Sequence, residues 1–478
     1  MRIGQTSFIS FISKGLSSAA GFVATILFAR LLGPEVLGRY YLLLSIVAWL
    51  SLLGSIGIGS AITKRVSEGT DVGEYRLGGG LVIASIGLII IAGLLLFQGS
   101  ITSVFDINRI GFIIVLLAVG LLGSYVDAML NGAHMVHVAA VLKTARRIAR
   151  TVLQVGGVLL SFGLTALVMG YALGGLVLVI AGLYVLGGPY HLPQKKHVER
   201  LVDYAKYAWM GRLEGKTFQQ ADVIILGLFV PSSLVGIYGI TWNIASFLII
   251  FSTSISGALF PELSKLSADD RDEQVAGLVE DALSYTGLVT IPGLVGGLLL
   301  SNRILRIYGD EFVQGAQVLA LLILSVLFYG YQKQFTNALG GIDRPRAAFK
   351  VNSILIAANM TLNVVLVSSL GMVGAALASA LSSFLSLVGG YYILGRHLGF
   401  SVPVAEIARQ IGATVAMGAL LTVLNSAITR ANEPFPNEVT TTALITVGAA
   451  TYFGVLVSIS PRFRTVVLDN VPQVASLR

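Results

Sequence analysis

The densest group of polar and charged residues lies in segment 204–230, which reads YAKYAWMGRLEGKTFQQADVIILGLFV. On a helix, Arg212, Lys216 and Gln219 fall within an arc of about 60°, and Asp222 lies to one side of it. Positive groups and hydrogen-bond donors can replace the water around a phosphate or diphosphate. This stripe therefore predicts an anion-binding face. The alternative is that the spanning part of the helix begins later and the stripe is solvated.

A second cationic face occurs earlier in the chain. Lys143, Arg147 and Arg150, followed by Gln154, again share an arc of about 60° on a helix. Like charges at this spacing repel one another, so the face calls for an anionic partner. Two partners remain open. One is a charged substrate, and the other is phospholipid headgroups reached by snorkelling side chains.

Three further ionisable residues interrupt or border long apolar runs. They are Asp127, Lys333 and Arg30. A charge deep in a membrane span costs about 2.5–3.5 kcal/mol on insertion scales, so it usually faces a cavity or a partner. Lys333 and Arg30 are predicted substrate contacts, while Asp127 or Asp222 is the candidate cavity or coupling acid. Alternatively, Asp127 and Lys333 neutralise buried partners, and Arg30 caps a helix C-terminus.

The elements that carry these residues are predicted from hydropathy. The chain has 478 residues, of which 55% are hydrophobic and 12% charged, and its mean hydropathy is +0.84. Soluble domains carry about 25% charged residues, so a soluble globule is excluded. Runs of about 20 apolar residues predict an all-α polytopic membrane protein. About fourteen spans are expected, at 7–32, 40–62, 78–97, 110–130, 138–160, 164–186, 204–230, 234–260, 283–300, 317–339, 347–369, 373–394, 407–427 and 439–460.

Charge placement predicts the orientation. With the N-terminus inside, 25 of the 32 Lys and Arg residues fall on the inner side and 6 on the outer side. This asymmetry predicts a multi-pass protein of the cytoplasmic membrane with both termini cytoplasmic. It also explains the +8 net charge without a nucleic-acid partner. Cysteine is absent, which excludes disulfides and thiolate metal sites, and neither a metal nor a cofactor is expected.

The spans divide into two pseudo-symmetric halves. The prediction is a six-helix bundle at 1–186, a basic cytoplasmic linker at 187–203, a second six-helix bundle at 204–400, and a terminal helix pair with a short tail at 401–478. A faint repeat links the halves, because a Pro, a Gly and a Tyr follow the first span of each. These are Pro34, Gly38 and Tyr40 in the first half, and Pro231, Gly236 and Tyr238 in the second. Repeated halves are common in transporters that bind substrate near the midplane.

Several stretches resemble the oligosaccharide and polysaccharide flippases of the multidrug/oligosaccharidyl-lipid/polysaccharide superfamily. They are 27–47, with LFARLLGPEVLGRYYLLLSIV, 221–266, which includes Asp222 and the Gly-Ile-Tyr turn at 236–238, and then 307–322 and 339–382. The resemblance implies two helical bundles around a cationic cavity and an extra helix pair for a lipid tail. It also implies a polyprenyl- or dolichyl-phosphate-linked saccharide as substrate. Membrane lipid and glycan-assembly enzymes are the other expected partners.

The leading hypothesis is therefore a flippase that works by alternating access, not an enzyme. Its product would supply surface polysaccharide or glycoprotein glycans. A multidrug or cation antiporter of the same superfamily is the alternative, although it should prefer a neutral or acidic cavity. A membrane glycosyltransferase or glycan polymerase would need acidic or metal-binding residues in a sizeable outer loop, and the sequence has no such loop.

Overall fold

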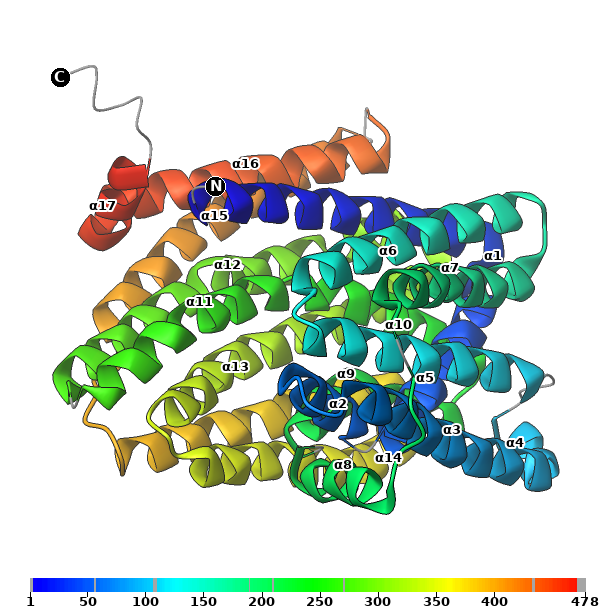
Figure 1. Ribbon diagram of the computed structural model, residues 1–478. Helices are drawn as coiled ribbons and strands as arrows, with labels where there is room; N and C mark the ends of the chain where they lie inside the picture. The colour runs from blue at the N-terminus through cyan, green and yellow to red at the C-terminus, as the bar shows by residue number, and fades with distance from the viewer. Residues whose placement is uncertain are drawn as a thin grey trace. The chain divides into compact units, whose positions relative to one another are not determined.

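The computed structural model describes residues 3–55, 57–105, 110–188, 190–208, 210–269, 271–431 and 435–470 (Figure 1). Side chains are described from residue 21 onward, except at 104, 206–213 and 466–470. Within these residues the regular elements are helices throughout. The chain divides into two compact units, Met1–Gly239 and Ile240–Arg478. The four-part division expected from the sequence stays a prediction.

The first unit is built from the blue to green helices of Figure 1. These are α1 (Ile3–Ser55), α2 (Ile58–Ser67), α3 (Val72–Leu96), α4 (Gln98–Phe105), α5 (Ile110–Gly132), α6 (Val136–Leu159), α7 (Gly163–Leu186), α8 (Lys195–Ala208), α9 (Met210–Phe229) and the first half of α10 (Ser232–Ser246). Helix α1 packs on α5, α6, α7 and α9, and α6 packs along α7.

The second unit continues from α10 with the remaining helices. These are α11 (Ile249–Ala268), α12 (Asp272–Arg306), a short 3-10 helix (Asp310–Gly315), α13 (Ala316–Gly341), α14 (Pro345–Gly395), α15 (Val404–Arg430), α16 (Asn437–Ile459) and α17 (Pro461–Asn470). One apolar core joins α11, α12, α13 and α14. A second core joins α12 to the terminal pair α15 and α16.

The predicted all-α membrane fold is confirmed. Among the described residues, nine helices are long and apolar enough to span a membrane, or ten if the bent pair α10–α11 counts as one span. Helix α14 has 51 residues, so it would be about 77 Å long if straight, against a hydrocarbon core of about 30 Å. It instead breaks at Gly371 and so holds two of the expected spans, while α1 breaks at Gly33 and holds one expected span and most of the next. Helices α6 and α9 lie at the two most basic expected spans, but neither is among the helices that pass this test in the described part of the chain.

Two expected spans were wrong in detail, and the segment expected as a linker contains part of a helix. The predicted span 40–62 is interrupted, because Gly57 at φ 77° separates α1 from α2. The predicted span 234–260 bends by 43° between α10 and α11. The predicted linker 187–203 contains the start of α8, whose His197 is buried. The backbone N–H of Gln194 donates to His197 Nδ1 at 3.0 Å, and His197 Nε2 lies 3.2 Å from Asp71.

The Pro-Gly-Tyr repeat marks a close helix crossing. A Cβ placed on Gly38 of α1 would overlap the carbonyl group of Ser232 and lie 2.9 Å from the backbone nitrogen of Gly236. A Cβ on Gly236 of α10 would likewise overlap the carbonyl of Pro34 and lie 2.9 Å from the nitrogen of Gly38. The two glycines therefore let the backbones touch, as small residues do in membrane helix pairs.

Candidate functional site

The functional candidates of the first unit are positioned by a tight α6–α7 pair. A Cβ on Gly170 of α7 would lie 2.8 Å from the backbone nitrogen of Gln154, and one on Gly174 would lie 2.8 Å from that of Arg150. These glycines are four residues apart and lie on one side of α7. Their missing side chains bring the backbone of α6 against α7 where α6 carries its cationic face.

Two arginines of α6 lie against one aromatic ring of α7. The Cζ atom of Arg150 is 4.6 Å from the ring centroid of Tyr171, and that of Arg146 is 5.7 Å from it. Arg146 also donates from Nη2 to the Tyr171 hydroxyl at 3.4 Å. A cation over an aromatic face gains roughly 0.5–2 kcal/mol, depending on its exposure. Tyr171 thus holds two like charges near one another.

A buried glutamine fixes the other side of this group. Gln154, which is 2% exposed, donates from Nε2 to the Tyr40 hydroxyl at 2.8 Å and to the Leu167 carbonyl at 2.6 Å. Its Oε1 accepts a hydrogen bond from Arg150 Nε at 3.3 Å. Tyr40 is itself buried in α1. Gln154 therefore fixes the Nε atom of Arg150 at the point where α1, α6 and α7 meet.

Helix α9 carries a further cation in the same unit. Lys216 of this helix is partly buried. The Tyr171 site comprises Tyr40, Arg146, Arg150, Gln154 and Tyr171, and Lys216 stays a predicted substrate contact. Neither Arg146 nor Arg150 forms an ion pair with a carboxylate among the described residues. The site can therefore attract an anion.

The rest of the predicted α9 stripe is only partly described. Gln219 is exposed, whereas the side chain of Arg212 lies outside the described residues. Asp222 is 3% exposed and accepts a hydrogen bond from the Tyr238 hydroxyl. The tyrosines of the two sequence repeats, Tyr40 and Tyr238, thus both have buried polar partners.

The other predicted residues of the first unit are partly or fully exposed. Lys143 Nζ is 2.7 Å from Asp127 Oδ1, and their side chains are 53% and 32% exposed. The structure thus brings together the predicted acid and one cation of the α6 face. Arg147 is exposed on the same helix, and Arg30 is exposed on α1, three residues before the break at Gly33.

Lys333 belongs to the second unit. It is partly buried on α13, and its Nζ atom lies 5.9 Å from the ring centroid of Tyr329. Neighbouring polar residues in α13 make structural contacts. Gln334, for example, donates to the Ser252 carbonyl at 3.1 Å and accepts from Ser256 at 3.0 Å. The role of Lys333 as a substrate contact remains a prediction.

Sequence reasoning missed Arg146, Tyr171 and Tyr40 as members of the cationic site. Arg146 lies outside the arc that Lys143, Arg147 and Arg150 share, yet its guanidinium lies against the same Tyr171 ring as that of Arg150. Tyr171 stands in a run that is otherwise apolar and glycine-rich, MGYALGGLVL. The usable signal was the Gly170–Gly174 spacing, which marks the close-packing side of that helix.

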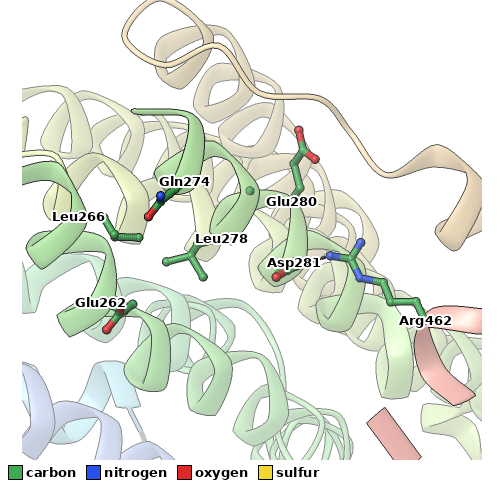
Figure 2. A pocket seen from close by; sticks show the side chains of 8 residues that line it. Glu262, Leu266, Gln274, Leu278, Glu280, Asp281 and Arg462 are labelled. Carbon is green, nitrogen blue, oxygen red and sulfur yellow. Dashed lines mark ion pairs between the residues drawn. The ribbon is translucent and has the colours of Figure 1, made fainter. Parts of the chain in front are cut away.

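A cavity of about 420 Å³ lies in the second unit. Figure 2 shows Glu262, Glu280 and Asp281 around it, with Arg462 of α17 reaching the carboxylate of Asp281. Glu280 already accepts hydrogen bonds from the Ser401 N–H at 2.8 Å and hydroxyl at 2.7 Å. Glu280 and Asp281 thus fasten α12 to the segment before α15 and to α17. No cluster of three or more His, Asp or Glu side chains in the described ranges could hold a metal ion.

Apolar helices in two units, with cationic side chains set among them, define a polytopic α-helical membrane protein of transporter type. Comparison with known proteins gives the family. The family described as "Polysaccharide biosynthesis protein" matches residues 3–267, which is more than half of the chain, and MatE matches residues 216–366. The chain belongs to the polysaccharide biosynthesis protein family, and the resemblance drawn from its sequence is confirmed.

Relatives of similar length agree with this assignment. The chain is 29% identical over 469 residues to "Probable flippase AglR" of Haloferax volcanii, covering 97% of each. It is 26% identical over 427 residues to "Probable low-salt glycan biosynthesis flippase Agl15" of the same organism, covering 88% of this chain and 89% of the relative. The solved structure "Lipid II flippase MurJ, inward closed conformation" aligns with a TM-score of 0.78 at 17% identity, covering 96% of this chain and 100% of that one. This last likeness concerns the fold.

Proposed function

We propose that this protein translocates lipid-linked saccharides across a membrane by alternating access. The observation that carries the proposal is the cluster of cations at Tyr171, whose arginines pair with no carboxylate among the described residues and are set among apolar helices. Such a cluster suits an amphipathic anion, whose charged part needs cations while its tail stays in lipid. The family and the names of the two Haloferax relatives support the same substrate class.

The proposal also names the lipid carrier, the membrane, the orientation of the chain and the fate of the product. The carrier is a polyprenyl or dolichyl phosphate, and the membrane is the cytoplasmic one, with both termini on the cytoplasmic side. The helix pair in 401–478 receives the lipid tail. The product supplies enzymes that assemble surface polysaccharide or glycoprotein glycans.

Among the residues predicted from the sequence, Arg212, Lys216 and Gln219 contact the phosphate-bearing part of the substrate. Lys333 and Arg30 make further contacts during transport. Asp222 or Asp127 couples transport to a cation or proton. The two candidate acids differ in their surroundings. Asp222 is buried against Tyr238, while Asp127 is partly exposed beside Lys143.

A cation antiporter agrees less well with the site. Cationic drugs would be repelled by Arg146 and Arg150 unless carboxylates offset them, and the described part of the Tyr171 site contains none. We therefore place the antiporter second.

The test is a translocation assay in proteoliposomes. The purified full chain is reconstituted with a fluorescent short-chain polyprenyl-phosphate saccharide, and a quencher outside the vesicles reports transbilayer exchange. We expect exchange well above that of empty liposomes, and loss of exchange when the same fluorescent lipid lacks its phosphate. Exchange no faster than in empty liposomes, for several saccharides and with an active control flippase, overturns the proposal. Drug-driven proton or sodium flux would then be measured.

A further inference from the structure

The feature that goes beyond this function is the way α6 and α7 hold two like charges together. Arg146 and Arg150 are four residues apart on α6, a spacing at which like charges destabilise a helix. Both guanidinium groups nevertheless lie within 6 Å of the Tyr171 ring centroid, at 5.7 and 4.6 Å. Two like charges held this close to each other call for an anionic partner.

Within the described part of the chain, the protein does not neutralise the two arginine charges. Arg146 bonds to the Tyr171 hydroxyl and Arg150 to the Gln154 amide oxygen, both neutral groups. Lys216 of α9 is a further, partly buried cation of the same unit. By contrast, Lys143 at the start of the α6 face has its own carboxylate, Asp127, at 2.7 Å. Partly buried cations without a counter-charge are costly in a membrane protein, so an anion from outside the chain completes the site.

The site is also built before a ligand arrives. Gln154 is 2% exposed, and its amide uses both hydrogen-bonding ends, donating to Tyr40 and Leu167 and accepting from Arg150. Gly174 lets the backbone of α7 touch that of Arg150. Fixing a guanidinium in advance lowers the entropy lost on binding, which is how a rigid site gains affinity.

We propose that Arg146 and Arg150 bind the phosphate group that joins lipid to saccharide in the substrate, with Lys216 as a third cation. Tyr171 and Gln154 act as positioning residues. This assignment rests on the proposed function and adds its recognition site. Guanidinium groups form paired hydrogen bonds with phosphate oxygens, whereas a neutral sugar or an isoprenoid tail offers no such partner. A phospholipid headgroup carries the same chemistry, so the test must separate the two sources.

The first experiment measures binding directly. The full chain is placed in nanodiscs of zwitterionic lipid and titrated with a short-chain prenyl phosphate that carries one sugar. The Arg146→Gln/Arg150→Gln double variant should bind it about tenfold or more weakly, because two charge-assisted contacts are lost. The matched control is Arg65→Gln/Arg306→Gln, which removes the same charge from two arginines that already pair with Glu68 and Asp310. It should retain wild-type affinity.

Two further comparisons identify the group that is bound. The corresponding prenyl glycoside without phosphate should bind wild type and the double variant equally weakly. Phosphatidylglycerol in excess should compete poorly with the saccharide probe. Unchanged affinity of the double variant for the phosphorylated probe overturns the assignment, and so does full competition by phosphatidylglycerol, which would make this a headgroup site.

The positioning role of Tyr171 has its own readout. Tyr171→Phe keeps the ring and should retain affinity within about threefold, whereas Tyr171→Leu removes the cation–π face and should lose about tenfold. Equal losses in both variants contradict the role of the ring. Arg146→Lys/Arg150→Lys, which keeps the charge, should recover part of the lost affinity and exclude misfolding as the cause. If wild type translocates no lipid-linked saccharide, the proposed function fails. If it translocates normally with both arginines replaced, only this site fails.

Discussion

Replacing Gly38 by alanine tests the helix crossing that the Pro-Gly-Tyr repeat marks. The added methyl group would overlap the Ser232 carbonyl and lie 2.9 Å from the Gly236 nitrogen. Both contacts are with backbone, which cannot rotate away as a side chain does. The two helices must therefore separate or shift before alanine fits at position 38.

The expected change in unfolding free energy is the difference between a steric cost and a gain in helix propensity. Overpacking typically costs about 1–3 kcal/mol, and a clash with rigid backbone lies near 3. Alanine is about 1 kcal/mol better than glycine inside a helix, so the net loss of unfolding free energy is about 2 kcal/mol. At Gly21, on the same helix α1, an added Cβ would meet no heavy atom of the described residues within 4 Å. Gly21→Ala should therefore stabilise the protein by about 1 kcal/mol.

The assay compares the melting temperatures of the two variants in the same detergent. Their stabilities should differ by about 3 kcal/mol, which for a unit of this size corresponds to roughly 6–12 °C, with Gly38→Ala the lower. Loss of the folded monomer peak in size-exclusion chromatography gives an independent measure. Equal melting temperatures for Gly38→Ala and Gly21→Ala would refute the close backbone contact.

Three further substitutions address the remaining contacts. Asp127→Asn removes the carboxylate that pairs with Lys143 and should raise affinity for an anionic prenyl-phosphate probe about two- to fivefold, because a part-exposed ion pair contributes less than about 1 kcal/mol. A fall in affinity would contradict this. Gly174→Ala should lower the unfolding free energy by about 1–3 kcal/mol, whereas Gly156→Ala, with open space around it, should not. Arg462→Ala removes the contact with Asp281 and should speed protease cleavage within α17, while unchanged cleavage argues against that anchor.

Hydropathy predicted the spans well because the energy of transferring apolar side chains out of water is additive along a segment. It failed where the backbone, not the side chains, decides the structure. Gly57 at φ 77° interrupts a mostly apolar run, and the bend between α10 and α11 likewise falls inside an apolar stretch. The start of α8 was missed for the opposite reason. Its charged residues indicated a linker, although His197 and Leu201 form a buried face.

The site was only half predictable because a membrane helix that is apolar all round gives no sign of which way it faces. The polar residues of α6 do have a periodicity, so Arg150 and Gln154 could be placed on one face from the sequence. Helix α7 has no such pattern, and Tyr171 could have faced lipid as well as α6. What orients α7 is the position of Gly170 and Gly174, since helices in lipid associate through close packing of small residues. The rotation of such a helix should therefore be read from its glycine spacing before its aromatic residues are assigned to lipid.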